Sequence, residues 1–548
     1  MGWRDARQLA HVAFGELSFQ AVYAFRQGNI VPTESARALV PKARRRVTQS
    51  KVIVSAVLAL LAIGAAGFLR QAPTIAAALF GASVSPTIVD TGVVTGLLTL
   101  DAAFLWWTGL QVLPTLLSSA VLPVLEPLPI DPTTFRRTAA LVYLRLFDLP
   151  VATVLVATPL ALGLALGPAA GLAVVPGVFV SVVFSLALSL LTGRFFVRRI
   201  QGARGGGGRS VVRWVLLLLW LVPSFAILGF VTAGGQFLAA LAAVSSHGPA
   251  LARDLLFATY PLPFALDTGI AAHGTGGTGL DPGASLAVVF GTVGYLLLAL
   301  WAGTWLFGEI RELGHLPVAH VAPGPTGDRA LRPRNPAASV LRKDLRIASR
   351  TPGYAFLLLL PILDAVALGL LTVADAPGPA AARGLALGTV TAAALLATFF
   401  GPAFFSIEVL AYSYGRTLPL SDRAVVLGKT GLIALIYLVA SGIVLVLASV
   451  RVFEPVLFIA FVAAELPAVV GAAFVELGWL YRRARAKGFP VANLYSGGWV
   501  AFLVAIPGLF VAAAPLVVYR IAGLPAMAFA AAVELALLAP FALREGPG

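Results

Sequence analysis

The stretch TLPLSDRAVVLGKTGL, residues 417–432, contains VLGKT, which is similar to the end of a phosphate-binding loop. A nucleotide-binding loop needs the pattern G-x-x-x-x-G-K-[ST], because its first glycine lets backbone N–H groups wrap around the phosphates. In this chain Arg423 stands at the position of that first glycine, five residues before Gly428, and no strand is predicted upstream. VLGKT is therefore interpreted as a false match, and Lys429 needs another role.

Acidic residues inside the predicted membrane spans are the strongest candidates for chemistry. An ionisable side chain at bilayer depth costs several kcal/mol on insertion scales, so each one marks a potential functional site. Asp101 and Asp364 lie midway along their spans and are predicted to line a substrate pathway. Glu465 and Glu476 are separated by about 1100° around a helix and therefore share one face. That face either lines a polar pathway or packs against polar groups on neighbouring helices.

Two further acidic residues, Asp148 and Glu534, also fall within predicted spans. Asp148 lies close to the cytoplasmic end of its span, three residues after Arg145, so the two side chains are expected to pair across one helical turn or through water. Asp148 is therefore predicted to have a structural role.

Other reaction chemistries lack the residues that they need. The chain has no cysteine, which excludes disulfides, thiolate metal sites and cysteine nucleophiles. The five histidines are scattered over predicted loops on opposite sides of the membrane, so no metal site at a recognised spacing is expected. No Ser-x-x-Lys, Gly-x-Ser-x-Gly or His-Glu-x-x-His pattern is present. We expect that the chain is not an enzyme, has no catalytic residues and binds no metal or cofactor itself.

Composition identifies the bilayer as the solvent of this chain. Of the 548 residues, 59% are hydrophobic and 11% are charged, compared with about a quarter charged in an ordinary soluble domain. The long apolar runs have about 20 residues each, which spans roughly 30 Å of hydrocarbon as a helix. Because backbone polar groups must be satisfied internally in lipid, these runs are predicted to be helices. The predicted fold class is therefore all-α integral membrane.

About twelve transmembrane helices are predicted, in two sets of six. The first set comprises residues 52–69, 91–112, 146–167, 170–192, 212–233 and 284–307, and the second comprises 354–373, 386–405, 430–450, 456–479, 498–518 and 524–541. The N-terminal residues carry charges throughout, so no cleaved signal peptide is expected.

Basic residues indicate the orientation of these spans. With both termini in the cytoplasm, nearly all Lys and Arg residues lie on the cytoplasmic side, as the positive-inside rule predicts. The net charge of +15 is therefore interpreted as a topological signal, and binding of nucleic acid, the alternative for a basic chain, is not expected. We predict a multi-pass protein of a prokaryotic plasma membrane. The basic residues left on the outer side are Arg70, Arg253, Arg383, Arg451 and Arg520.

The two sets of six spans resemble each other. KARRR at 42–46 parallels RKDLR at 342–346, and each basic segment runs into the first span of its half. EPLPIDPTTFRRTAALVYL at 126–144 parallels RTLPLSDRAVVLGKTGLIA at 416–434, and each carries Leu-Pro, an aliphatic residue and a small or acidic candidate for a helix N-cap. These parallels predict two homologous six-helix repeats in parallel orientation. The predicted domains are residues 1–314 and 340–548, joined by a cytoplasmic linker at 315–339 that is rich in Pro, Gly and Arg.

The stretch around VLGKT is better explained as a short helix at the membrane surface. Pro419 ends the preceding helix, and Ser421 or Asp422 is a candidate N-cap for a new helix that continues into the next span. Lys429 is expected to lie at the interface, with its stem in the apolar zone and its ammonium group in water.

The combination SIEVLAYSYGRTLPLSDRAVVLGK resembles the region after the second span in ABC-2-type exporter permeases, and RKDLRIASRTPGYAFLLLLP resembles the amphipathic helix that leads into their first span. The resemblance covers most of residues 340–490, and residues 40–200 more weakly. It implies a coupling helix between spans two and three that rests on an ATP-hydrolysing subunit. The implied coupling residues are Leu128, Pro129, Asp131, Arg136 and Arg137 in the first half, and Leu418, Pro419, Ser421, Asp422, Arg423 and Lys429 in the second.

The chain departs from the family pattern in two respects. Short re-entrant helices between spans five and six fit into residues 234–283 of the first half, whereas the second half has only a few residues around Arg520. Family members are commonly single six-span chains that pair, but here both halves lie on one chain and have diverged. The resemblance therefore implies one permease chain that binds two copies of an ABC ATPase subunit.

The function predicted from these observations is the permease of an ATP-driven ABC exporter. ATP and Mg²⁺ are expected on the partner ATPase. The apolar spans suit small-molecule, lipid or peptide cargo equally, so the substrate stays open. The alternative is an ion-coupled secondary carrier that uses Asp101, Asp364 or Glu465 as its ion site. An intramembrane lipid-processing enzyme is disfavoured by the lack of a catalytic cluster.

Overall fold

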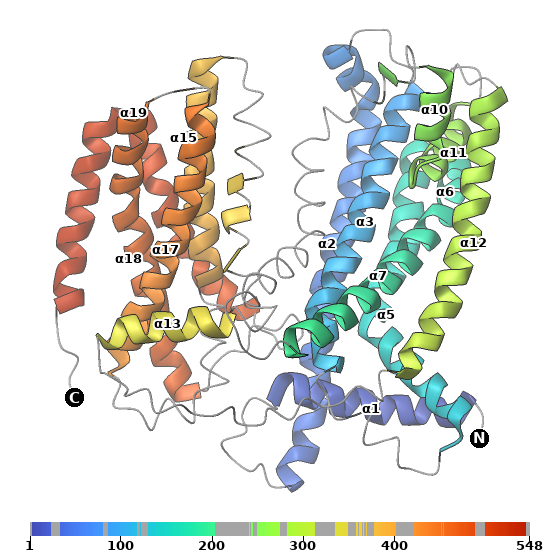
Figure 1. The fold of residues 1–548 in the computed structure, drawn as a ribbon, viewed down its shortest axis with the longest axis horizontal. Coiled ribbons are helices and arrows are strands. Elements are labelled where there is room, and N and C mark those ends of the chain that lie inside the picture. Colours follow the sequence, from blue (N-terminus) through green and yellow to red (C-terminus); the bar gives the residue numbers. More distant parts are fainter. Residues whose placement is uncertain are drawn as a thin grey trace. The chain divides into compact units, whose positions relative to one another are not determined.

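The computed structural model is α-helical throughout the part of the chain that it describes (Figure 1). The described residues are 3–23, 33–80, 86–117, 121, 130–202, 241, 243–244, 249–274, 282–312, 335–348, 358–359, 361–363, 365–366, 369, 378–401, 421–450, 452, 454–487 and 499–543.

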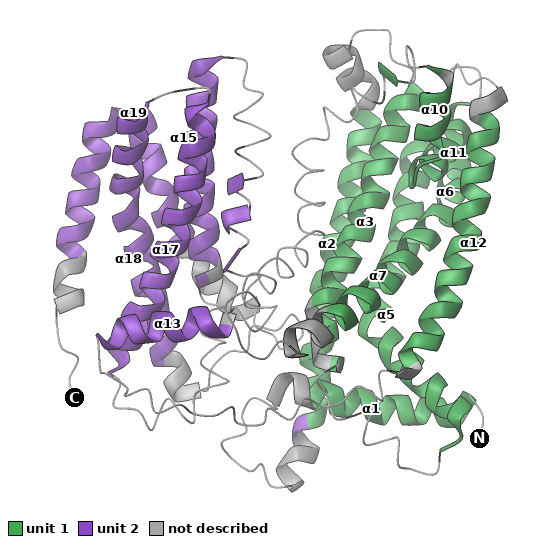
Figure 2. Ribbon diagram, in the orientation of Figure 1, with its two compact units in different colours: residues 1–20, 40–198, 222–318 green, residues 21–39, 199–221, 319–548 purple. Residues whose placement is uncertain are grey.

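These residues form two compact units (Figure 2). The division after Val318 falls inside the predicted linker. The first unit contains α1 (Trp3–Tyr23, to residue 20), α2 (Thr33–Phe80, from residue 40), α3 (Pro86–Leu117), α5 (Pro132–Leu166), α6 (Pro168–Ala173), α7 (Val175–Gly202, to residue 198), α10 (Ala250–Phe257), α11 (Leu262–His273) and α12 (Pro282–Glu312). The second unit contains α13 (Pro336–Ala348), α15 (Pro379–Phe400), α17 (Asp422–Ser449), α18 (Pro455–Lys487) and α19 (Trp499–Leu543).

The apolar runs form membrane-spanning helices, as predicted. Nine helices of the described part are long and apolar enough to cross a membrane, or ten if a bent pair counts as one span. These nine helices include ten of the predicted spans, because α19 contains both 498–518 and 524–541. The other two predicted spans lie outside the described residues, 212–233 entirely and 354–373 for the most part.

Helix α19 consists of two arms that meet at Gly523. This glycine has φ 77° and ψ −176°, a conformation that only glycine adopts readily, and it interrupts the helix. Gly508 and Glu534, on opposite arms, line the same cavity. On a continuous helix these residues would be about 39 Å apart, so the chain must fold back at Gly523. The predicted break between the last two spans, residues 519–523, contains this turn.

A second interruption occurs in the interval 234–283, where short helices are expected. Helices α10 and α11 meet at an angle of 91°, which makes them a broken span or a re-entrant pair. Helix α11 packs against α3 and α6, and its side chains Phe264, Ala265 and Leu266 are fully buried. The pair is therefore part of the core of the first unit.

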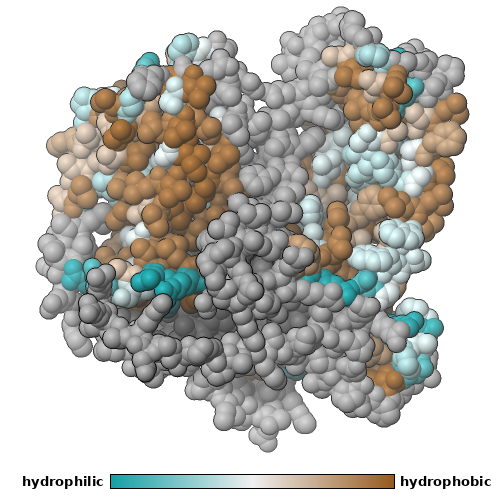
Figure 3. Space-filling model, in the orientation of Figure 1, coloured by the Kyte–Doolittle hydropathy of each residue, from teal (hydrophilic) through white to brown (hydrophobic). Residues whose placement is uncertain are grey.

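Two helices lack the apolar character of the spans. In α13 the side chains of Val340 and Asp344 are buried, whereas Arg342 and Arg346 are exposed. Helix α1 has the same two-faced pattern, with alanines on its buried side. Figure 3 shows hydrophobic side chains over the described helices of the second unit, and hydrophilic ones gathered at the level of α13. Both helices are therefore amphipathic.

Candidate functional site

The coupling segments predicted from the sequence include two capped helix starts. Helix α5 begins after Asp131, whose carboxylate accepts from the backbone N–H groups of Thr133 and Thr134, both at 3.2 Å. Helix α17 begins after Ser421, whose hydroxyl accepts from the N–H of Ala424 at 3.2 Å. Both N-cap predictions are confirmed, and Ser421 rather than Asp422 is the cap in α17. The predicted residues Leu128, Pro129, Leu418 and Pro419 lie outside the described part of the chain.

Both helix starts present polar side chains to solvent. Asp131 and Arg136 are exposed in the first unit, as are Ser421 and Asp422 in the second, and Arg423 is half-buried. The hydroxyl of Thr133 donates to the Asp131 carboxylate and, together with the two backbone N–H groups, lowers the pKa of this carboxyl group. These surfaces are accessible to a protein partner.

The stretch VLGKT forms the crossing point between α17 and α13. A Cβ atom on Gly428 would lie 2.7 Å from the carbonyl oxygen of Ala337 and 2.8 Å from the Cβ atom of Val340. These distances are shorter than van der Waals contact, so only glycine lets the two helices approach this closely. Gly428 therefore holds a helix crossing rather than a phosphate group.

Lys429 is buried at this crossing, and the prediction that its ammonium group lies in water is wrong. Its Nζ atom donates to the Oδ2 atom of Asp344 on α13 at 2.9 Å, and both side chains are 0% exposed. The Nζ atom of Lys343 lies 3.5 Å from the other carboxylate oxygen of Asp344. Lys429 thus has a counter-ion within the protein, which removes the need to reach water. It cannot contact a partner subunit directly, and it instead joins α17 to α13.

In the first unit α1 crosses the start of α5 in a similar way. Thr138 follows the N-cap Asp131 by seven positions, as Gly428 follows the N-cap Ser421. Thr138 is buried, and its hydroxyl lies 3.5 Å from the carbonyl oxygen of Ala6. The Arg137 guanidinium stacks over the Trp3 ring, 4.8 Å from its centroid. Neither Arg136 nor Arg137 is buried as Lys429 is, so these arginines do not occupy an equivalent place.

An ion pair of the first unit joins α2 to α5. The Nζ atom of Lys51 lies 2.7 Å from the Oδ1 atom of Asp148 and 4.6 Å from the centroid of the Phe14 ring, and it also donates to the carbonyl oxygen of Arg145. Asp148 has the structural role predicted for it, but its ion-pair partner is Lys51. The predicted partner, Arg145, directs its guanidinium to His11, at 3.3 Å.

The intramembrane carboxylates have different surroundings. Asp101 is fully buried and accepts from the hydroxyl of Thr158 at 2.8 Å, while its other oxygen has no hydrogen-bond donor among the described residues. Glu465 accepts from the hydroxyls of Thr391 and Tyr437, both at 2.7 Å. Glu465 therefore packs against polar groups of α15 and α17. Asp364, the other predicted pathway residue, lies outside the described part of the chain.

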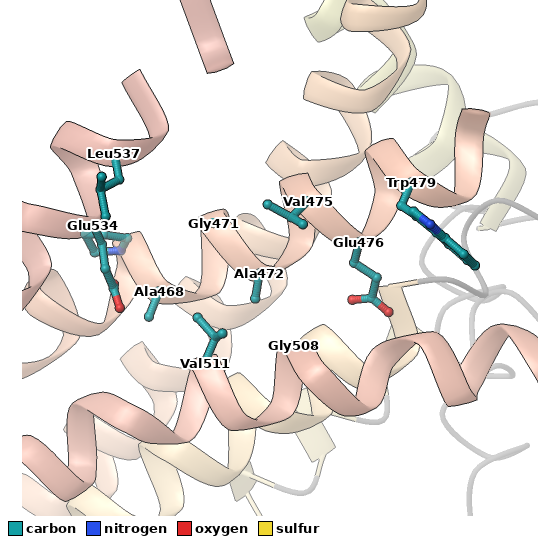
Figure 4. Close-up of a pocket in the computed structure, with 11 residues that line it drawn as sticks. Ala468, Gly471, Ala472, Val475, Glu476, Trp479, Gly508, Val511, Glu534 and Leu537 are labelled. Atoms are coloured by element: carbon teal, nitrogen blue, oxygen red, sulfur yellow. The ribbon is translucent and has the colours of Figure 1, made fainter. Parts of the chain in front are cut away.

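Glu476 lies in a cavity of about 540 Å³ that does not include Glu465 (Figure 4). The two glutamates have different neighbours, because Glu465 engages α15 and α17 whereas Glu476 faces α19. The cavity is lined by Pro467, Ala468, Gly471, Ala472, Val475, Glu476, Trp479, Gly508, Val511, Glu534 and Leu537.

Sequence reasoning missed Asp344 and Lys51. A signal for Asp344 was present, because it follows Val340 by four residues and precedes Ile347 by three, which places a charge on the apolar stripe of an amphipathic helix. A charge at such a position needs a buried partner. Lys51 lies in a basic segment and carried no comparable signal. No three His, Asp or Glu side chains of the described ranges come together to hold a metal ion.

Together, the membrane-spanning helices, the amphipathic helices and the buried carboxylates define a multi-pass, all-α integral membrane protein. Residues 74–544 match the family described as "Membrane protein of 12 TMs", and the chain belongs to this family. The twelve spans in this description agree with the number predicted from the sequence. No curated protein and no solved structure matches the chain.

Proposed function

We propose that this protein is the permease of an ATP-driven exporter of the ABC-2 type, which couples ATP hydrolysis by a separate subunit to export. One observation carries the proposal: the start of α17 is capped and exposed at Ser421, and about two turns further it is fastened to α13 by the buried pair of Lys429 and Asp344. A helix start that is accessible on one side and rigidly held on the other is suited to receive force from a partner.

In this function Ser421, Asp422 and Arg423 form the contact surface for the ATPase. Lys429 couples a movement of α17 to α13 through its ion pair with Asp344. The capped start of α5 at Asp131 is a second contact surface of the same kind, in the other unit. Two such surfaces agree with two ATPase copies for one permease chain. The bent pair α10 and α11 occupies the interval in which the ABC-2 resemblance implies short re-entrant helices.

The test is binding and stimulation of the ATPase subunit encoded by a neighbouring reading frame. Purified permease in nanodiscs is expected to bind this subunit and raise its hydrolysis rate. The double substitution Asp422→Ala and Arg423→Ala is expected to weaken binding about tenfold, because two polar contacts are lost from an exposed surface. A matched control is Arg383→Ala, which removes a paired, partly exposed charge at the start of α15. An affinity that is unchanged in the first variant, or equally reduced in the control, contradicts the proposal.

An ion-coupled carrier is the second candidate, and it is favoured by Asp101. One oxygen of this fully buried carboxylate lacks a donor in the described part of the chain, and Thr158 is its hydrogen-bond partner on the other side. Such a group suits reversible binding of a proton or sodium ion. The purified chain would be tested for transport in proteoliposomes that contain no ATPase. Transport under these conditions, together with its loss in the Asp101→Asn variant, would establish the carrier and refute the exporter.

A further inference from the structure

The cavity in the second unit combines an apolar lining with two acidic side chains. Its volume of about 540 Å³ lies within the range of about 300–1,000 Å³ that is typical of small-molecule sites. One wall belongs to α18, and the other belongs to the two arms of α19 (Figure 4). The exposed side chains of Val475 and Val511 form part of its lining, so the cavity is open to an apolar ligand from outside the helix bundle.

The carboxylate of Glu476 is the feature that points to a ligand. Its side chain is 5% exposed, and neither of its carboxylate oxygens has a hydrogen-bond partner among the described residues. A Cβ atom added to Gly508 would lie 3.4 Å from the Oε2 atom of Glu476, so the carboxylate lies directly over this glycine of the facing helix. A buried carboxyl group without a donor is unfavourable, which is why such groups in proteins are normally paired.

A second carboxylate and an aromatic ring define the kind of ligand. Glu534, on the second arm of α19, also lines the cavity, and its buried Oε2 atom lacks a partner within the described ranges. Trp479 lies one turn from Glu476 on α18, and the two residues are neighbours in the lining (Figure 4). Carboxylates attract a positive charge, and an indole ring provides a favourable face for an organic cation. The remaining lining is aliphatic and suits a hydrophobic body.

We propose that this cavity is a binding site for an amphipathic organic cation. The cationic group lies at Glu476 and Trp479, and the apolar body lies along Ala468, Ala472 and Val511. Glu534 contributes a second negative charge at the opposite end of the cavity, so elongated cations with two positive groups also fit. The proposal depends on the cavity alone and holds for an exporter, a carrier or a membrane protein that only senses its ligand.

The experiment measures binding of radiolabelled tetraphenylphosphonium to the purified full chain in lipid nanodiscs, with empty nanodiscs as the blank for partitioning into lipid. Saturable binding is expected, and Glu476→Gln is expected to raise the Kd about tenfold or more, because it removes the charge and keeps the shape. Trp479→Leu is expected to raise the Kd about fivefold through loss of the aromatic face. Tetraphenylborate, which has the same shape and the opposite charge, should not compete.

Glu465→Gln is the matched control, because Glu465 lies on the same helix, is equally buried and is not part of the cavity. Its Kd should remain within about twofold of the wild-type value. If Glu476→Gln does not fold, Val475→Trp decides the question, since it fills the cavity from an exposed position and leaves both carboxylates in place. The proposal is overturned by non-saturable binding, by competition from tetraphenylborate, by equal effects of the two glutamine substitutions, or by unchanged binding in Val475→Trp.

Discussion

Breaking the ion pair between Lys429 and Asp344 should release α13 from α17. Because both side chains are 0% exposed, neither the ammonium nor the carboxylate can be rescued by water when its partner is removed. Removing one member of such a pair costs about 3–5 kcal/mol, most of which is the penalty of leaving the other charge buried and unpaired. Lys429→Met should lie near the lower end of this range, since Lys343 remains 3.5 Å from Asp344. Asp344→Leu leaves the buried ammonium without its carboxylate and should cost more.

The assay uses the absence of native cysteine. Val340 is 2% exposed and faces Gly428 at the crossing, so a thiol introduced by Val340→Cys reports local opening of α13. A loss of 3–5 kcal/mol corresponds to a labelling rate that is about 150 to 4,000 times faster with a hydrophilic maleimide. Global unfolding is monitored separately by size-exclusion chromatography, because a chain with two units need not unfold in one step.

The double substitution Lys429→Met with Asp344→Leu provides the decisive comparison. Replacing both members of a buried pair by apolar residues is often neutral, so labelling should return to within about tenfold of the wild-type rate. The two single effects would then be strongly non-additive, as expected for residues in direct contact. If the single substitutions leave the thiol protected, or if their effects add in the double variant, the pair does not hold the crossing together.

Three further predictions concern the same framework. Gly428→Ala should destabilise the crossing by about 1–3 kcal/mol, because its Cβ atom would lie 2.7 Å from a backbone oxygen of α13, and labelling of the Val340→Cys thiol should increase accordingly. Gly523→Ala should cost about 1–3 kcal/mol through backbone strain at φ 77°, which a lowered thermal midpoint in detergent would reveal, whereas Gly294→Ala, which meets no atom, should have little effect. The pKa of His11 is lowered, first by the charge of Arg44, then by slight burial and then by the charge of Arg145. Because protonation of His11 therefore opposes docking, α1 should be docked most firmly above the ordinary pKa of about 6.5 and should loosen as the pH falls from there through the lowered value. Labelling of a Leu17→Cys thiol, corrected for thiol ionisation, should show this loosening, and His11→Asn should abolish its pH dependence.

The positions of the helices could be predicted well from the sequence, because a run of apolar residues of sufficient length has one stable form in a bilayer. The helix starts after Asp131 and Ser421 could also be predicted, since an N-cap depends only on residues within one turn. In the same way, the polar residues between the last two spans indicated the turn that occurs at Gly523.

The contacts of single charged residues could not be predicted. Lys429 near the end of a span was expected to reach water, and its actual partner lies 85 positions earlier, on a different helix. Helical spacing placed Glu465 and Glu476 on one face, but their surroundings depend on which helices pack there. The cavity at Glu476 exists only because α19 folds back and brings Gly508 and Glu534 to the same side of α18. Packing between residues that are far apart in the sequence cannot be predicted from the periodicity of a single helix.

The two units fasten the helices that begin after Asp131 and Ser421 by different ion pairs, and this bears on the proposed mechanism. In the second unit a fully buried ion pair fastens α13 directly to α17. In the first unit the ion pair of Lys51 and Asp148 joins α2 to α5, and Asp148 is 56% exposed, so solvent weakens this pair. Force applied at the start of α17 would therefore pass mainly into α13. Force applied at the start of α5 would pass into α2, through the weaker, partly exposed ion pair of Lys51 and Asp148. If both halves of the proposed permease lie on one chain, such inequality can evolve, because a substitution in one half is not copied into the other. The two proposed contact surfaces should accordingly differ in mechanical role even where both bind the same ATPase.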